Sequence, residues 1–285
     1  MTLSLNTWKS MENSDFAVFI LTHGRPNNVK TLTTLKKCGY IGKYYLIVDN
    51  EDKSIDTYIR NFGIEKIKIF DKKVIADQVD EGNNFDNRKV IIHARNACFE
   101  IAKDLGIIYF VQFDDDYYYF GYRYQSGAKI INNLNKVFEA ILEFYKNTTT
   151  TTIAFSQGGD HIGGFSGIKL KRKAMNSFFC STERPFKFIG SINEDVNTYT
   201  TLGCRGNIFF TFTNIQLDQK DTQSNSGGMT DEYALTGTYI KSFHSVLMHP
   251  SGVKISMMNS NNPRLHHLIK WNNTTPMIVS ERHKK

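Results

Sequence analysis

The sequence predicts an α/β fold with a mostly parallel, Rossmann-type sheet and helices on both faces. Three observations predict it: short runs that are apolar throughout, amphipathic segments that alternate with them, and acidic turns that follow two of the runs. Strands of parallel sheets are buried on both faces, so they are typically apolar at every position. Alternation of such strands with helical patterns indicates strand–helix–strand units.

The elements of the first 150 residues follow in order. Strands are expected at residues 16–22, 44–48, 67–70 and 107–113, where the chain is apolar. Helices are expected at residues 29–38, 90–105 and 134–145, because apolar residues recur there at helical spacing. Gly39 and Gly106 suit the ends of the first two helices. Beyond residue 150 the pattern is irregular, and we expect strands and loops that form an acceptor site and a lid.

Composition narrows the class of protein. The chain has 285 residues, a formal net charge of +7, 40% hydrophobic and 22% charged residues. These values are ordinary for a folded domain and argue against a disordered chain or a disulfide-rich miniprotein. We expect no membrane partner and a cytoplasmic location, because no apolar run approaches the roughly 18 residues of a membrane helix and the four cysteines form no C-x-x-C pair. The positive charge suits polyanions, but it also suits a solvated basic surface.

Asp114, Asp115 and Asp116 are the strongest candidate site. They directly follow a predicted buried strand, and ligands of open α/β sheets bind at the carboxyl ends of strands. Three adjacent carboxylates repel one another, and Mg²⁺ or Mn²⁺ would relieve that repulsion while also binding phosphate oxygens. The middle carboxylate is expected to point the other way, towards a ribose or sugar hydroxyl. The alternative is a solvated acidic turn.

A resemblance to a known family covers most of the chain. The pattern resembles GT-A-fold glycosyltransferases, especially the inverting family-2-like enzymes, and is closer still to the TET-associated glycosyltransferases of phages. The motifs that carry it are THGRPNNVKTL, VDNEDKSIDTY, ARNACFEIAKDLG, FDDDY, QGGDHIGG, INEDVNTYTTLG, GGMTDEY, GTYIKSFHSV and RLHHLIKW. The resemblance implies one GT-A domain over residues 1–285, with a nucleotide-sugar-binding half (1–125) and an acceptor-binding half (126–285).

The resemblance also implies roles for individual residues. Asp114 and Asp116 fall on the metal motif, and His266 or His267 is the expected further ligand, with His244 and His249 as rivals. Asp195 is the expected catalytic base and Glu194 a neighbouring acceptor-binding group. Alternatively, the two acids merely favour the first turn of a helix capped by Asn193.

The nucleotide sugar is expected to meet residues at the ends of the first strands and on the helix that opens with Ala94. This set contains Thr22, Arg25, Asp49, Arg95, Asp114 and Asp115. Asp49 would accept hydrogen bonds from a uracil or a ribose, and Arg95 would pair with the diphosphate. Each residue taken singly also fits an ordinary turn or helix face.

The resulting hypothesis is a metal-dependent, inverting glycosyltransferase. It would move a hexose, glucose from UDP-glucose, onto a 5-hydroxymethyl pyrimidine in phage DNA, in the cytoplasm of the host. Two rivals remain open: a glycosyltransferase acting on a glycan, protein or lipid, and a non-catalytic basic protein that binds nucleic acid. The sequence predicts no oligomeric state.

Overall fold

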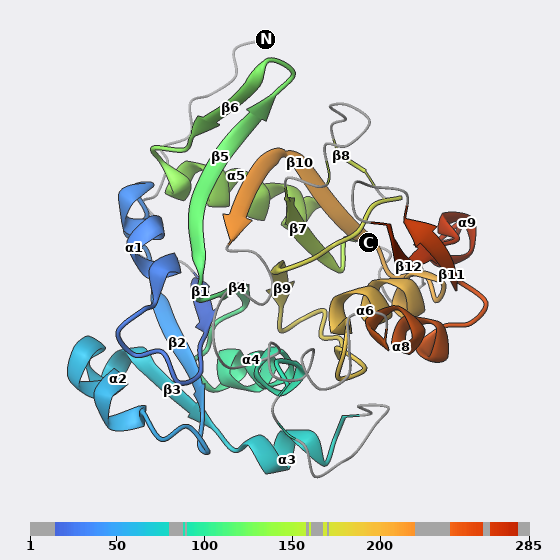
Figure 1. Ribbon diagram of the computed structural model, residues 1–285. Helices are drawn as coiled ribbons and strands as arrows, with labels where there is room; N and C mark the ends of the chain where they lie inside the picture. The colour runs from blue at the N-terminus through green and yellow to red at the C-terminus, as the bar shows by residue number, and fades with distance from the viewer. Residues whose placement is uncertain are drawn as a thin grey trace.

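A large mixed sheet forms the centre of the protein and confirms the predicted α/β fold (Figure 1). The computed structural model describes residues 15–79, 88, 90–157, 160, 168–169, 171–219, 240–258 and 263–278. The sheet has ten strands in the order β3-β2-β1-β4-β9-β7-β10-β5-β6, and β8 pairs with β10. Seven strands (β1–β4, β6, β7 and β10) run in one direction and three (β5, β8 and β9) run against it. The sheet is therefore mostly parallel, as predicted.

The strands of this sheet have the following bounds: β1 Phe16–Leu21, β2 Tyr44–Asp49, β3 Ile67–Phe70, β4 Tyr109–Asp114, β5 Tyr117–Tyr124, β6 Gly127–Ile130, β7 Thr152–Ser156, β8 Ile168–Lys169, β9 Ser177–Ser181 and β10 Phe209–Gln219. The helices that accompany it are α1 Lys30–Lys37, α2 Ile55–Phe62, α3 Lys72–Ala76, α4 Ile92–Asp104, α5 Leu134–Asn147 and α6 Glu194–Gly203, with a 3₁₀ turn at Ile64–Lys66.

Strand β1 shows why helices cover both faces. All six of its residues are buried, and successive side chains of a strand point to opposite faces. Phe16, Val18 and Ile20 join a core that contains residues of α1, α2 and α5. Ala17, Phe19 and Leu21 join a second core that contains residues of α4 and α6. The uniformly apolar sequence of β1 thus supplies two cores at once.

The order of the strands reverses at β1. Strand β1 pairs in parallel with β2 on one side and with β4 on the other, so the chain order reverses there. Such reversals mark the point where open α/β sheets bind ligands, outside the carboxyl ends of the strands. Leu21, the last residue of β1, lies beside Asp114, the last residue of β4. The Asp triplet therefore begins at the carboxyl end of β4, beside the end of β1.

The second half of the chain extends the same sheet, which we did not expect. Strands β9 and β7 follow β4, and β10 joins them to β5. Polar residues obscure this pattern in the sequence, because Thr152 and Ser156 are buried in β7. Their hydroxyls donate hydrogen bonds to the backbone carbonyls of Phe179 and Ile215, which makes their burial tolerable.

A smaller layer lies at the C-terminal side (Figure 1). It contains helix α8 (Ile240–Met248), the antiparallel strands β11 (Val253–Met258) and β12 (Arg264–Ile269), and the short helix α9 (Trp271–Thr274). Both strands pack against α8, and α8 in turn contacts α6. No helix among the described residues has the length and apolar character needed to cross a membrane.

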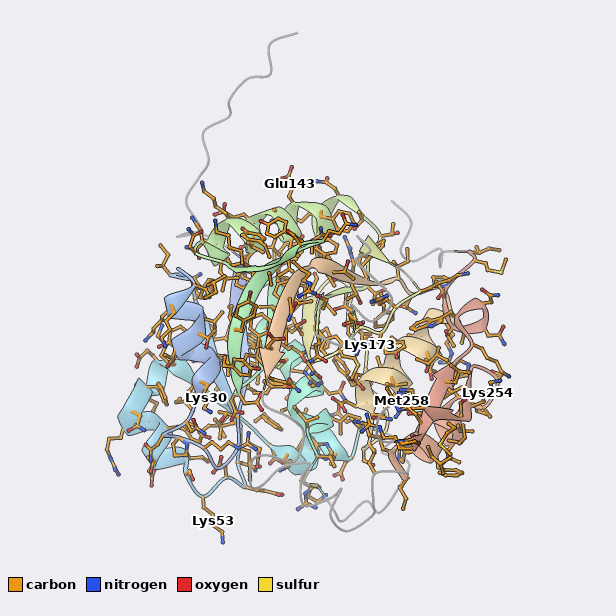
Figure 2. All side chains as sticks on the ribbon, turned by 45° about the horizontal axis from the view of Figure 1, so that its top comes forward. Lys30, Lys53, Glu143, Lys173, Lys254 and Met258 are labelled. Atoms are coloured by element: carbon orange, nitrogen blue, oxygen red, sulfur yellow. The ribbon has the colours of Figure 1, made fainter. Side chains whose placement is uncertain are left out.

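Substitution of Phe138 on α5 tests how this helix packs against strands from both halves of the chain. Its ring is fully buried and packs against Phe16, Phe113 and Phe179, which belong to β1, β4 and β9. In Figure 2 the opposite face of α5 carries Glu143 outward. We expect Phe138→Ala to lower the free energy of unfolding by about 3–5 kcal/mol, because the cavity removes contacts from several strands.

Urea denaturation measures this loss. Phe243→Ala is the control, because that ring is 50% exposed on α8 and its truncation should change the free energy of unfolding by less than about 0.5 kcal/mol. Equal losses in the two variants would contradict the packing of α5 described here.

Candidate active site

The turn that follows β4 is held in place by helix α1. The hydroxyl of Thr31 donates to the backbone carbonyl of Asp114 (2.6 Å) and accepts from the backbone N–H of Tyr117 (2.9 Å). The hydroxyl of Thr34, one turn along the helix, donates to the carbonyl of Tyr117 (2.9 Å). The backbone of the Asp triplet is thus fixed before any ligand binds. Thr31 lies in the motif THGRPNNVKTL and Thr34 lies two residues beyond it, but no sequence pattern indicated this role for them.

Asp115 joins the triplet to the loop that follows β1. Its two oxygens accept hydrogen bonds from the hydroxyl of Thr22 (2.7 Å) and from Nη1 of Arg25 (2.9 Å). The hydroxyl of Tyr58 on α2 contacts Thr22 Oγ1 (2.8 Å) and accepts from the backbone N–H of Arg25 (2.8 Å). The structure therefore brings Thr22, Arg25 and Asp115 together, and their role in binding the nucleotide sugar stays a prediction. Asp115 is only 4% exposed, however, and its carboxylate is used to hold this loop.

Asp49, at the end of β2, is likewise engaged within the protein. One carboxylate oxygen lies 2.7 Å from Nδ1 of His23, and the other accepts from the backbone N–H of Glu51 (3.1 Å) and lies 3.4 Å from Nζ of Lys72. Burial opposes ionisation, but His23 and Lys72 together hold the pKa of Asp49 below its usual value. Asp49 is 5% exposed. His23, which the sequence pattern left without a role, stands between this carboxylate and solvent.

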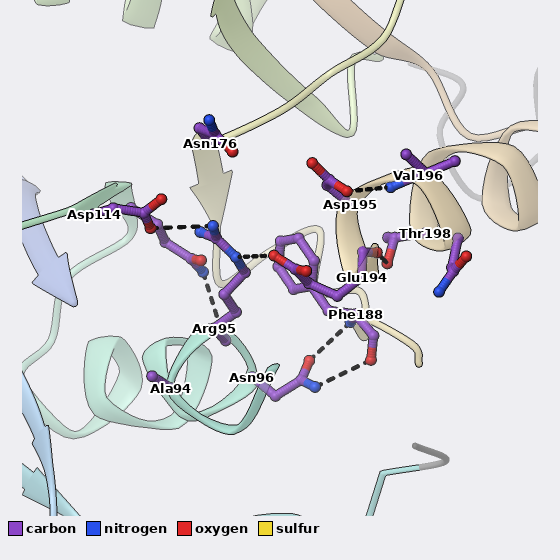
Figure 3. Close-up of polar contacts among 12 residues, drawn as sticks. Ala94, Arg95, Asn96, Asp114, Asn176, Phe188, Glu194, Asp195, Val196 and Thr198 are labelled. Atoms are coloured by element: carbon purple, nitrogen blue, oxygen red, sulfur yellow. Dashed lines mark hydrogen bonds and ion pairs between the residues drawn. The ribbon is translucent and has the colours of Figure 1, made fainter. Parts of the chain in front are cut away.

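Arg95 connects the Asp triplet to the acids of α6 (Figure 3). Its Nη2 donates to Asp114 (3.1 Å) and its Nε donates to Glu194 (3.0 Å). The side chain is 1% exposed, and its guanidinium lies 5.0 Å from the ring centre of Phe178 and 5.7 Å from that of Phe188. The sequence predicted a contact with the diphosphate. In the structure the guanidinium donates to two carboxylates through Nε and Nη2, while its buried Nη1 has no hydrogen-bond partner among the described residues. Contact with the diphosphate stays a prediction.

The segment before α6 is fixed by the next residue of the same motif. Asn96 exchanges two hydrogen bonds with the backbone of Phe188: its amide donates to the carbonyl (3.1 Å) and its oxygen accepts from the N–H (2.8 Å). Gln112, buried within β4, donates to the carbonyl of Arg95 (3.0 Å) and so ties α4 to the strand. The tripeptide Ala-Arg-Asn therefore orients both β4 and α6. Only the arginine was assigned a role from sequence.

Glu194 and Asp195 occupy the first turn of α6. Asn193 precedes them with φ 55°, but its side chain makes no capping bond. Its amide instead donates to the carbonyl of Lys241 (2.8 Å) and to the hydroxyl of Ser245 (3.0 Å), which anchors α6 to α8. Asp195 accepts a hydrogen bond from the N–H of Val196 (2.7 Å). In Figure 3 its carboxylate is turned towards the side where Asp114 and Asn176 lie.

Negative charge is concentrated at this site. Burial, together with Asp116, Glu194 and Asp115, raises the pKa of Asp114 to about 7, although Arg95 opposes the shift. Burial likewise raises the pKa of Asp115 and of Asp116. Burial and the charge of Glu194 raise the pKa of Asp195 to about 6, with Lys241 acting in the opposite direction. Carboxylates that disfavour ionisation in isolation are well suited to a divalent cation.

The residues of the triplet fit a hard cation as an incomplete oxygen site. Within the described part of the chain, no three His, Cys, Asp or Glu side chains are grouped as metal ligands. Asp114 and Asp116 offer two carboxylates to such an ion, and substrate phosphate oxygens and water would supply the remaining ligands. Such a composition is typical of Mg²⁺ and Mn²⁺ sites that bind nucleotides.

His266 and His267 lie on β12, in the two-stranded sheet. Among the described residues, neither histidine forms a group of metal ligands with the Asp triplet. Their ring centres are 4.2 Å apart, closer than we expected for neighbours on a strand. Burial lowers the pKa of both, that of His267 to about 3, and Lys241 and Lys173 add to the shift. Both rings are therefore neutral at neutral pH. Their role as metal ligands stays a prediction, as do those of His244 and His249.

Three motifs quoted above fall wholly or partly outside the described residues: GGMTDEY entirely, QGGDHIGG except for its first residue and Asp160, and GTYIKSFHSV in its first three residues. Asp160 is buried and lies 3.4 Å from Nε of Arg172 and 3.9 Å from Nζ of Lys173. Arg172 and Lys173 thus have part of their positive charge balanced within the protein.

Comparison with known proteins identifies the family to which the chain belongs. A family model described as TET-Associated Glycosyltransferase matches residues 16–228. The chain belongs to this family, and it is a glycosyltransferase, as its motifs predicted. No curated protein matches the chain.

Solved structures with a similar fold are distant in sequence. Glucosyl-3-phosphoglycerate synthase from Mycobacterium tuberculosis, in complex with Mn²⁺, UDP and phosphoglyceric acid, is 11% identical with a TM-score of 0.47, covering 90% of this chain and 87% of that one. TarS of S. aureus in complex with UDP-GlcNAc is 10% identical with a TM-score of 0.44, covering 81% and 66%. A putative nucleotide-diphospho-sugar transferase from Desulfovibrio desulfuricans is 8% identical with a TM-score of 0.41, covering 82% and 96%.

Replacing Arg95 tests the connection between β4 and α6. We expect Arg95→Met to lower the free energy of unfolding by about 3–5 kcal/mol, because it leaves Asp114 and Glu194 close together without their shared cation. Denaturant unfolding at neutral pH measures the loss. Lys73→Met is the matched control, since its pair with Asp77 is exposed and contributes at most about 1 kcal/mol. If the two variants were equally stable, the guanidinium would not be holding the site together.

Proposed function

We propose that this chain is a metal-dependent, inverting glycosyltransferase that moves glucose from UDP-glucose onto a 5-hydroxymethyl pyrimidine in phage DNA, within the host cytoplasm. The single observation that carries the proposal is the contact of Arg95 with both Asp114 and Glu194. Through it, the acids suited to the donor and the acids suited to the acceptor form one site. The donor and the DNA acceptor follow from the resemblance of the motifs.

Asp195 is the proposed base. In an inverting transfer one carboxylate takes the proton of the acceptor hydroxyl as the oxygen attacks the anomeric carbon. Asp195 suits this role because its recorded hydrogen bond comes from its own helix turn, whereas Glu194 is held by Arg95. A pKa of about 6 keeps Asp195 ionised at neutral pH while leaving it more basic than an ordinary aspartate.

Asp114 and Asp116 are the proposed metal ligands. A Mg²⁺ or Mn²⁺ ion bound there would neutralise charge that develops on the departing diphosphate. Thr31 and Thr34 keep the turn in one conformation, and Arg95 limits the movement of Asp114. The preorganised turn therefore needs little rearrangement as the diphosphate departs.

The pH dependence of transfer tests the assignment of Asp195. Only the ionised carboxylate accepts a proton, so kcat should rise as pH increases through about 6 and level off above about 7. Asp195→Asn should lower kcat by about 10²–10⁴-fold while leaving the dissociation constant for UDP within about twofold. A full rate for this variant would exclude Asp195 as the base.

The acceptor is tested with defined DNA. Duplexes that differ only in one base (hydroxymethylcytosine, hydroxymethyluracil, 5-methylcytosine or thymine) are incubated with UDP-glucose and Mn²⁺, and mass spectrometry of the nucleosides records an added hexose. We expect addition to one or both hydroxymethylated bases and to neither methylated base. Asp114→Asn should abolish it, because it removes a metal ligand. Transfer to free saccharides but to none of these DNAs would favour the glycan-directed alternative.

A further inference from the structure

The acidic residues around the proposed donor side already have partners within the protein. Asp49 is bound by His23, Lys72 and the N–H of Glu51. Both oxygens of Asp52 accept backbone hydrogen bonds, from Gly24 (2.7 Å) and Ser54 (2.7 Å). Asp115 is bound by Thr22 and Arg25, as described above. These buried carboxylates are poorly placed to contact a nucleobase directly.

His23 is the exposed polar side chain that is bound to one of these buried carboxylates, Asp49. It directly follows Thr22 in the loop after β1, at the carboxyl ends of β1 and β2, where ligands of such sheets bind. Its side chain is 50% exposed although Nδ1 is fixed by Asp49 at 2.7 Å. No hydrogen bond joins its Nε2 to another described residue.

The partner of Nδ1 fixes the tautomer of the ring. A carboxylate only accepts hydrogen bonds, so Nδ1 carries the proton that it donates to Asp49. In the neutral ring Nε2 then has a lone pair and accepts. When the ring is protonated, Nε2 becomes a donor. Nε2 of the neutral ring can therefore pair with a hydrogen-bond donor of a ligand. Nε2 of the protonated ring can pair with an acceptor.

We propose that His23 reads the nucleobase of the sugar donor, its neutral Nε2 accepting a hydrogen bond from the N3–H of uracil. This inference rests on the proposed function, in which the donor is a uridine diphosphate sugar. Cytosine has no hydrogen at N3 and presents an acceptor there, so it meets the lone pair of neutral His23 unfavourably. Asp49 acts through His23 as a positioning residue.

The charged groups around His23 determine how this preference varies with pH. They are Asp49 on β2, Asp52 in the turn after it and Lys72 at the start of α3. The hydrogen bond with Asp49 raises the pKa of His23, while burial and Lys72 oppose the shift. As pH rises through this pKa the ring loses its proton. Preference for uracil over cytosine should therefore increase with pH.

Calorimetric titration with UDP and CDP, in the presence of Mn²⁺ and between pH 6 and 8.5, tests the proposal. The ratio of the two dissociation constants is the readout, because both ligands carry the same diphosphate and its own titration cancels. We expect wild-type protein to prefer UDP, by a factor that increases severalfold over this range. His23→Phe should weaken UDP by about three- to tenfold, the value of one neutral hydrogen bond, and should make the ratio independent of pH.

Two further variants separate positioning from charge. Asp49→Asn removes the carboxylate that fixes the tautomer, so it should reduce the preference for UDP although Asp49 itself makes no contact with the base. Lys53→Gln is the control, because Lys53 projects outward from the turn after β2 (Figure 2) and changes local charge without touching His23. It should leave the ratio unchanged.

The outcomes distinguish this inference from the proposed function. If UDP binds to wild-type protein and the UDP-to-CDP ratio is the same in His23→Phe, the role of His23 is wrong and the proposed function stands. If neither UDP nor UDP-glucose binds to wild-type protein at any pH, the uridine donor is wrong and this inference falls with it.

Discussion

The guanidinium of Arg95 is the interaction on which the rest of the site depends. It is buried against two aromatic rings and donates to carboxylates that stand on β4 and at the start of α6. Those two elements come from distant parts of the chain, and their acids would repel one another without a cation between them. Asn96 and Gln112 fix the backbone on either side of this contact. One short stretch of α4 thereby sets the geometry of both halves of the site.

Burying these charges costs free energy on folding, but it also fixes the positions of the acids that the proposed catalysis needs. Buried ion pairs lose so much hydration that they often add little net stability compared with apolar residues. Here they hold Asp114, whose pKa is raised, beside Asp116, whose pKa is raised as well. The same pattern recurs after β1, where Asp49 holds His23 and Asp115 holds Thr22 and Arg25. The buried acids position the groups that remain exposed.

The sequence predicted those features that are encoded by residues in consecutive positions. The apolar run of β1 and the acidic residues that end β4 are visible because each stands in consecutive positions. The pairing of Arg95 with Glu194 joins residues 99 positions apart, which no spacing indicates. Likewise, β7 was missed because its buried Thr152 and Ser156 look exposed until their backbone partners are known. The membership of the family was predicted because its motifs span most of the chain.

The most direct test is a crystal structure of the protein with UDP and Mn²⁺, with data collected at the manganese absorption edge. Anomalous scattering locates the ion independently of any interpretation of the protein density. We expect one strong peak in contact with Asp114 and Asp116, with the diphosphate on its open side and Arg95 still joined to Asp114 and Glu194. A bound UDP with manganese held elsewhere, or with Arg95 detached from both acids, would contradict the site described here.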